Sequence, residues 1–292
     1  MQISRLFDRP YPVYSMEVFP PKTKSSIETV YTTLAGLKGL PVDFISVTYG
    51  AGGSEVQKNK TCEIAGLIKK EYGIEPVAHL TCVTSTREDV LEIIDFLKKE
   101  GIDNVLPLRG DINPQMERKY DFYHANELAA FVKRHYPECS MAGACYPEVH
   151  YEAENMDQDI TNLMHKIDAG VDHLVTQVVF INDNCYAFLD KLRARGVDVP
   201  VEAGVMPLTS VSQVDRMVNM CGAILPQELY DIVDKYKDAP ADLEKAGVDF
   251  TIRQCLELIE RGVDGIHLYT MNKVKDTKTI TEAVVPALGR PL

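Results

Sequence analysis

The sequence predicts a single (β/α)8 barrel that spans residues 1–292, and three observations support this prediction. Short runs rich in β-branched residues alternate with amphipathic segments, and the alternation repeats eight times. An unusual polar or small residue stands at the C-terminal end of each apolar run. The length of 292 residues also suits one such barrel. A doubly wound sheet is the alternative for the same alternation.

Eight segments are predicted as strands. The first is 13–19, because the two prolines that follow it supply no hydrogen-bond donor to a sheet. The other seven are 43–50, 76–83, 103–110, 141–147, 172–180, 199–207 and 263–270.

Helices are predicted between the strands, most clearly over residues 85–101. Ser85 and Glu88 are expected to form a capping box there, and Gly101 is expected to end the helix. A longer helical excursion is predicted around residues 222–262. This connection is the one departure from an even spacing of strands.

Composition narrows the class of protein. The net charge of −12 disfavours nucleic acid or an anionic membrane as a partner, because both would be repelled. Seven scattered cysteines without a C-x-x-C pair argue against a disulfide framework and against a cysteine-based metal site. The N-terminus has no apolar signal core, and no segment approaches the ~20 apolar residues that span a bilayer. We therefore expect a cytoplasmic protein.

The strand ends predict the location of the site. In a barrel, the C-terminal ends of all strands meet at one mouth, where active sites are assembled. The polar or small residues at these ends are Glu17, Thr48, His79, Thr81, Arg109, Asp111, Tyr146, Gln177, Pro207 and Tyr269.

Glu17 is an acid inside a run that otherwise predicts a buried strand, "YSMEVFPPK". Either its side chain is solvated at the strand end, or it lies in an apolar pocket. A carboxyl group in an apolar pocket keeps its proton to higher pH and can serve as a proton donor.

Two common motifs are not supported. The stretch "VTYGAGGSE" has Glu55 where a dinucleotide fingerprint needs its third glycine, so we expect a flexible loop with Ser54 as helix cap. His79 and His150 lack the spacing of a metal site, and we predict hydrogen-bonding roles and no metal.

Arg109 and Asp111 flank Gly110 directly after a predicted strand. The arginine could grip an anionic ligand while the carboxylate accepts a hydrogen bond from a heterocycle. A salt bridge that closes the loop is the alternative.

Residues 145–170 predict a helix with one polar face. Met156, Ile160, Leu163, Met164 and Ile167 form the expected core face, at helical spacing. Another set, Asp159, Asn162 and Lys166, forms a polar stripe. The stripe is either a solvated face or a group of ligand contacts, because it follows the strand end "YPEVH".

The motifs taken together resemble the methylenetetrahydrofolate reductase family, in its short bacterial form. The resemblance covers residues 13 to 273 and is carried by "MEVFPPK", "ISVTYGAGGS", "AHLTC", "LRGD", "YPEVH", "DAGVDHLVTQVVF", "GVMP" and "HLYTMNK". It implies a (β/α)8 barrel that binds FAD non-covalently and uses NADH or NADPH to reduce 5,10-methylenetetrahydrofolate. It also implies a homo-oligomer.

The resemblance assigns roles by motif. Glu17 resembles the family's general acid, Asp111 the aspartate beside the flavin, and Gln177 the glutamine that binds folate, with Lys273 expected towards the folate tail. The expected FAD contacts are Thr48, His79, Arg109, Gly110, Asp111, Tyr146, His150, Asp159, Asn162 and Lys166.

The sequence departs from the best-known bacterial relatives at three positions. Val211 stands near the place of a phenylalanine that stacks on substrate, Lys273 replaces an arginine, and His165 replaces a basic residue near the cofactor. Three alternatives to this function stay open: a folate- or pterin-binding barrel without redox chemistry, a flavin-bearing subunit that takes its electrons from a partner protein, and a non-catalytic barrel.

Overall fold

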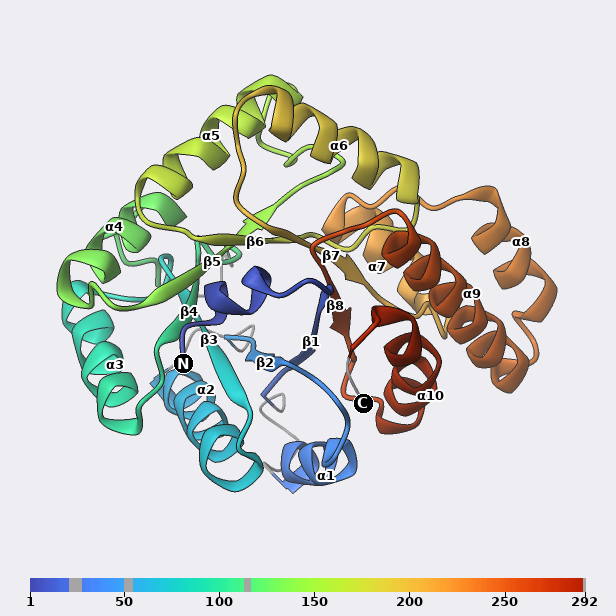
Figure 1. The fold of residues 1–292 in the computed structure, drawn as a ribbon, viewed down its shortest axis with the longest axis horizontal. Coiled ribbons are helices and arrows are strands. Elements are labelled where there is room, and N and C mark those ends of the chain that lie inside the picture. Colours follow the sequence, from blue (N-terminus) through green and yellow to red (C-terminus); the bar gives the residue numbers. More distant parts are fainter. Residues whose placement is uncertain (21–27, 50–54, 113–116, 291–292) are drawn as a thin grey trace.

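The computed structural model describes residues 1–20, 28–49, 55–112 and 117–290. Eight parallel strands form one closed barrel in sequence order, β1-β2-β3-β4-β5-β6-β7-β8 (Figure 1). This order confirms the (β/α)8 barrel and excludes the doubly wound sheet. The strands are β1 (Val13–Val18), β2 (Phe44–Val47), β3 (Glu75–Thr81), β4 (Asn104–Leu108), β5 (Ser140–Cys145), β6 (His173–Thr176), β7 (Val201–Val205) and β8 (Gly265–Tyr269).

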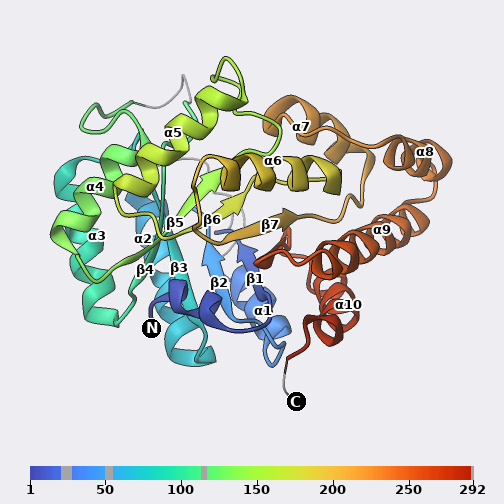
Figure 2. The ribbon, with the colours of Figure 1, turned by 45° about the horizontal axis from the view of Figure 1, so that its top comes forward.

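Helices surround the barrel and separate its strands (Figures 1 and 2). They are α1 (Glu28–Leu37), α2 (Glu55–Leu67), α3 (Arg87–Glu100), α4 (Ala125–His135), α5 (Met156–Asp168), α6 (Asn182–Ala194), α7 (Val211–Cys221), α8 (Gln227–Tyr236), α9 (Pro240–Glu260) and α10 (Val274–Val284), with a π-helical turn, η2 (Ile68–Tyr72), and a short 3-10 helix, η3 (Val285–Leu288). The predicted long excursion consists of α8 and α9, which extend to one side of the barrel in Figure 2.

An N-terminal 3-10 helix, η1 (Ile3–Asp8), lies across the barrel at the N-terminal ends of the strands (Figure 1). Its backbone amides at Ile3 and Ser4 donate to Asn104 Oδ1 and Ser140 Oγ, at the first residues of β4 and β5. Ile3 and Leu6 pack with Val13 and other barrel residues in one buried cluster. The barrel is therefore closed at this end and can hold a ligand at the other.

The predicted cap of α3 is wrong by one residue. Thr86, not Ser85, is the N-cap, and its capping-box partner is Asp89, not Glu88. The Thr86 side chain accepts from the Asp89 amide at 3.1 Å, and Asp89 Oδ2 accepts from the Thr86 amide at 2.8 Å. The two possible pairs have the same spacing, so the sequence alone could not separate them. Gly101 ends the helix at a φ of 67°, as predicted.

The strands are shorter than predicted at their C-terminal ends. β2 ends at Val47 and β6 at Thr176, so Thr48 and Gln177 stand in the loops that follow. The loop predicted around residues 50–54, with Ser54 as a cap, lies outside the described residues. The described polar side chains still gather at one mouth.

Candidate active site

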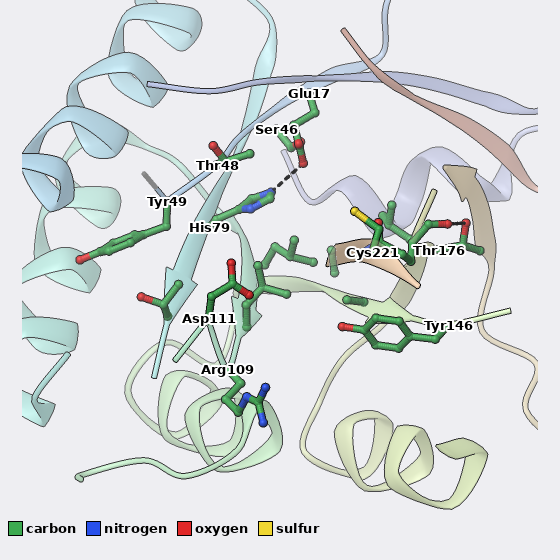
Figure 3. Close-up of a pocket in the computed structure, with 18 of the residues that line it drawn as sticks. Glu17, Ser46, Thr48, Tyr49, His79, Arg109, Asp111, Tyr146, Thr176 and Cys221 are labelled. Carbon is green, nitrogen blue, oxygen red and sulfur yellow. Dashed lines mark hydrogen bonds and ion pairs between the residues drawn. The ribbon is translucent and has the colours of Figure 1, made fainter. Parts of the chain in front are cut away.

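A cavity of about 440 Å³ opens at the C-terminal ends of the strands. It is lined by nine of the predicted site residues, which come from six strands or the loops that follow them (Figure 3). They are Glu17, Thr48, His79, Arg109, Gly110, Asp111, Tyr146, His150 and Gln177. The structure thus brings together side chains that are spread over 160 positions of sequence.

Glu17 faces two buried histidines from inside the barrel wall. Its Oε2 atom lies 3.6 Å from His79 Nε2 and 3.8 Å from His267 Nε2, and the Glu17 side chain is 18% exposed. Figure 3 shows the Glu17 carboxylate directed at the His79 ring. Burial lowers the pKa of His79 to about 4, against the smaller, opposite effect of Glu17. His79 is therefore neutral near pH 7 and does not act as a cationic partner of the Glu17 carboxylate.

The backbone after Glu17 is fixed by the loop that follows β8. Asn272 has a φ of 56°, and its side chain accepts from the Phe19 amide and donates to the Phe19 carbonyl. Thr270 Oγ1 donates to the Glu17 carbonyl oxygen at 2.6 Å. These contacts hold the end of β1 against β8, so the position of the Glu17 side chain is set by both strands.

Aromatic rings form one wall of the cavity. The rings of Tyr146 and His150 meet edge to face at 4.6 Å, and His150 stacks on Tyr151 at 4.5 Å. Arg109 donates to the Tyr151 hydroxyl at 2.6 Å and forms an ion pair with Glu152. Arg109 therefore pairs with the loop after β5, and not with Asp111 as the salt-bridge alternative required. A wall of this kind suits a flat heterocycle.

The tight turn beneath this wall carries backbone strain. Val149 has a φ of 68°, which is an outlier for a β-branched residue. Its amide donates to the Tyr146 carbonyl, and the next amide, of His150, donates to Asp159 Oδ2 at 2.9 Å. Strain that neighbouring contacts hold in place is common at functional sites. The turn aims the rings of Tyr146 and His150 at the cavity.

The polar stripe of α5 does not line the cavity in the described structure. Asp159 is buried, and its carboxylate accepts a hydrogen bond from the His150 backbone amide. The buried face of α5 therefore includes this acidic residue. Lys166 Nζ donates to the Ala144 carbonyl at 2.8 Å and lies 5.8 Å from the Tyr146 ring centre. Asn162 is exposed and accepts from Gln158. Met156, Met164 and Ile167, predicted for the core face, are only partly buried.

Lys273 also lies away from the lining residues. It stands at the N-terminus of α10, where its Nζ donates to Thr209 Oγ1 at 2.7 Å and lies 3.6 Å from Asp276 Oδ2. Val211 begins α7 with its side chain 45% exposed, and His165 is exposed on α5. In this structure the three departures therefore lie outside the cavity.

Asp111, Gly110 and Gln177 occupy different parts of the cavity wall. Asp111 is exposed at the mouth, and its carboxylate is directed into the pocket in Figure 3. Gly110 has a φ of 82°, and an added Cβ would lie 2.8 Å from Val83 Cγ2, so this position requires glycine. Gln177 Oε1 accepts from the Val178 amide. The Gln177 amide nitrogen is the end of the side chain that remains to donate to a ligand.

Sequence reasoning did not single out Ser46, Cys221 or His267, which also line the cavity, although it did place Tyr269 at the mouth. The alternation of β8 contains a usable signal, since Gly265, His267 and Tyr269 recur with the period of a strand. Tyr269 Oη donates to the Thr176 carbonyl at 2.8 Å. Cys221 closes the cavity from the end of α7, a contact that no local pattern indicates.

Two features of the described residues bear on other classes of protein. In that part of the chain, no helix is long and apolar enough to cross a membrane. The same residues contain no group of three or more histidine, cysteine or acidic side chains that could hold a metal ion.

A closed parallel barrel with an acid, two histidines and an aromatic wall at its C-terminal mouth defines a class, the (β/α)8 proteins with a small-molecule site. The family model of methylenetetrahydrofolate reductase matches residues 2–285. The chain therefore belongs to the methylenetetrahydrofolate reductase family, as its motifs indicated.

Bacterial relatives match over most of both chains. The 5,10-methylenetetrahydrofolate reductase of Pectobacterium carotovorum is 33% identical over 275 residues, covering 94% of this chain and 89% of the relative. The enzyme of the same name from Escherichia coli is 30% identical over 276 residues, covering 94% of this chain and 92% of the relative.

Methylenetetrahydrofolate reductase 1 of Schizosaccharomyces pombe is 32% identical, and the match covers 92% of this chain but 45% of the relative. The chain thus spans about half the length of such eukaryotic relatives.

Solved structures agree on the fold. A protein from Clostridium thermocellum, described as binding two copies of 5-methyl-5,6,7,8-tetrahydrofolic acid, has a TM-score of 0.64 and 15% identity. The alignment covers 98% of this chain and 99% of that protein. Tryptophan synthase from M. tuberculosis has a TM-score of 0.59 at 10% identity, with 97% of each chain covered. At these identities the likeness concerns the barrel alone.

Proposed function

We propose that this chain reduces 5,10-methylenetetrahydrofolate to 5-methyltetrahydrofolate, with FAD held at the barrel mouth and NADH or NADPH as electron donor. The observation that carries the proposal is the set of Glu17, Asp111 and Gln177 around one cavity in a chain of this family. In the proposed cycle, the nicotinamide binds and leaves before the folate binds.

The cavity residues fit a flavin. The wall of Tyr146 and His150 offers flat surfaces, and Thr48, Arg109 and Gln177 offer polar groups around it. His79 Nε2 is buried without a hydrogen-bond partner in the described chain, so a polar ligand edge would satisfy it. Bound there, FAD would supply hydride transfer between the nicotinamide and the folate.

The α5 stripe would act on the cofactor from behind this wall. Lys166 is partly buried, and desolvation of its ammonium group lowers the pKa of that group. A cation beneath Tyr146 would favour an anionic cofactor in a protein whose net charge is −12. A direct contact of Asp159, Asn162 or Lys166 with FAD would require these side chains to turn from the partners they have here.

Glu17 would supply the proton that the reaction needs. Opening the five-membered ring of the substrate requires a proton at N10, and Glu17 is the carboxyl group that faces the cavity from deep in the barrel. Gln177 would hydrogen-bond the folate ring, and Asp111 would influence the ligand at the mouth through its charge. Glu17 would thus act on the folate and not on the nicotinamide.

The substitution Glu17→Gln tests this assignment, because it keeps the size of the side chain but removes its acidic proton. We expect flavin reduction by NADH or NADPH to stay within about threefold, because that step needs no proton from Glu17. Oxidation of the reduced protein by methylenetetrahydrofolate should slow by ~10² to 10⁴, the usual contribution of a general acid. Anaerobic rapid mixing measures the two half-reactions separately.

Glu148→Gln is the matched control, since Glu148 binds Asn184 and the Ile224 amide outside the cavity lining. A folate half-reaction near the parent rate in Glu17→Gln would remove Glu17 from the chemistry. If neither nicotinamide bleaches the flavin of the purified parent, electrons come from a partner protein. A purified chain that holds no flavin would favour a folate-binding barrel without redox chemistry.

A further inference from the structure

The barrel interior is polar on one side. Interiors of this fold are usually filled by branched apolar side chains, and β4, β5 and β6 follow that rule with Leu106, Ala142 and Val175. On the opposite side, β7, β8 and β1 contribute Glu202, His267 and Ser15, all of them buried. Gly265, which has no side chain, leaves room for Glu202, because a Cβ at position 265 would lie 2.8 Å from Glu202 Cγ.

These polar residues form a line that ends at Glu17. Ser15 Oγ lies 2.6 Å from Glu202 Oε1 and 2.6 Å from His267 Nδ1. His267 Nε2 lies 3.4 Å from Ser46 Oγ and 3.8 Å from Glu17 Oε2. The line therefore connects the bottom of the barrel to the acid in the cavity.

Glu202 is held in its neutral form. Burial raises the pKa of Glu202 well above its usual range, against the smaller, opposite effect of the hydrogen bond with Ser15, and the negative charge of Asp43 raises it further. Its second oxygen, Oε2, has no hydrogen-bond partner in the described part of the chain. An unpaired carboxylate in such a place would carry a large desolvation penalty.

The other ionisable groups of the barrel interior and of the strand ends near Glu202 either have partners of their own or are neutral. Asp43 forms ion pairs with Arg9 and Arg290, and His173 on β6 lies 2.9 Å from Asp172. His79 on β3 is neutral near pH 7, as described above. Arg9 and Arg290 are thus both engaged by Asp43, and in the described part of the chain no ion pair involves Glu202. The carboxyl proton is thus available for a hydrogen bond to Ser15.

A neutral Glu202 determines where His267 carries its proton. If the carboxyl O–H donates to Ser15 Oγ, the single hydroxyl proton of Ser15 is directed at His267 Nδ1, which must accept it. In its neutral form the ring then has its proton on Nε2, facing Glu17 and Ser46. An ionised Glu202 can only accept a hydrogen bond, so Ser15 would donate to it and would accept from Nδ1–H of His267. The neutral ring would then have no proton on Nε2.

We propose that Glu202 is a positioning residue that, through Ser15, keeps the ring proton of His267 on Nε2 and directed at Glu17. The proposal rests on the function proposed above for Glu17. As Glu17 gives up its proton, the developing carboxylate faces an N–H group already in place, and this donor stabilises the negative charge. Glu202 itself touches neither substrate nor cofactor.

Two substitutions separate this role from packing. Glu202→Gln keeps a donor, because its amide N–H can replace the carboxyl O–H, whereas Glu202→Met fills the space without one. Gln254→Met is the control, since Gln254 is a buried polar residue outside the barrel that donates to the Val179 carbonyl. All proteins are studied with FAD bound.

The first measurement is the ¹⁵N spectrum of the histidine rings, with the His267 signals assigned by their loss in His267→Asn. We expect a proton on Nε2 in the parent and in Glu202→Gln, and a mixture of the two ring forms in Glu202→Met. A proton on Nδ1 in the parent would overturn the proposal, as would a parental spectrum in Glu202→Met.

The second measurement is the folate half-reaction across pH. Glu202→Met should slow it by about tenfold, the worth of one hydrogen bond, and change its pH profile, while flavin reduction by nicotinamide stays at the parent rate. Glu202→Gln should stay within about threefold of the parent. Equal losses in both variants would show that Glu202 acts by ionising, and would overturn the proposal. If the parent lacks a folate half-reaction, the proposed function fails, and the ring spectrum alone decides this inference.

Discussion

The buried His79 makes a quantitative prediction about acid stability. Its pKa is lowered by burial from 6.5 to about 4. Below pH 6.5 the unfolded chain binds a proton at this ring that the folded protein does not bind, so stability is lost as pH falls towards 4. A shift of this size corresponds to about 3 kcal/mol in full, of which about 2 kcal/mol is lost by pH 5.

The substitution His79→Gln removes this titration while keeping a polar side chain of similar size. We expect the parent to lose about 2 kcal/mol more unfolding free energy than His79→Gln between pH 8 and pH 5. Urea denaturation of the cofactor-free proteins at several pH values measures the difference. His124→Gln, at an exposed position, is the control for the change of residue type.

The same loss of stability in the parent and in His79→Gln would refute the reasoning. It would mean that the ring takes up its proton in the folded state, with Glu17 as its partner across 3.6 Å. In that case the Glu17–His79 pair would be an ion pair at mildly acidic pH, and the description of His79 as a neutral neighbour of Glu17 would be wrong.

Three further predictions concern other parts of the barrel. Glu202→Gln should gain stability relative to the parent as pH rises above 4.5, by about 1.4 kcal/mol per pH unit, because the folded parent keeps a proton that the unfolded chain releases; parallel stability curves would contradict a neutral Glu202. Gly204→Ala should cost at least ~1–3 kcal/mol in urea denaturation, since its Cβ would lie 2.5 Å from the Thr176 carbonyl, whereas Gly66→Ala has room. Lys166→Ala should weaken FAD retention, measured as flavin release on dilution, and exposed Lys235→Ala should not; equal retention would separate α5 from the cofactor.

The sequence by itself determined the fold class and the family. Eight short β-branched runs separated by amphipathic segments have few ways to bury both faces of each strand, and a closed parallel barrel is the one adopted. The sequence also determined that Glu17, His79, Arg109 and Gln177 meet at one mouth, because each stands at or near a strand end. The fold class and the position of the mouth depend only on local periodicity and on the direction of the chain, whereas the family depends on the resemblance of the motifs.

Tertiary structure alone decided which side chains touch. Arg109 turned to Glu152 and not to Asp111, and Asp159 turned inward beneath His150, because loop geometry directs each side chain. The line from Glu202 through Ser15 to His267 joins residues 187 and 252 positions apart. Such contacts depend on the register with which β1 closes against β8 and on the space that a glycine leaves beside an acid, and neither has a local signal in the sequence.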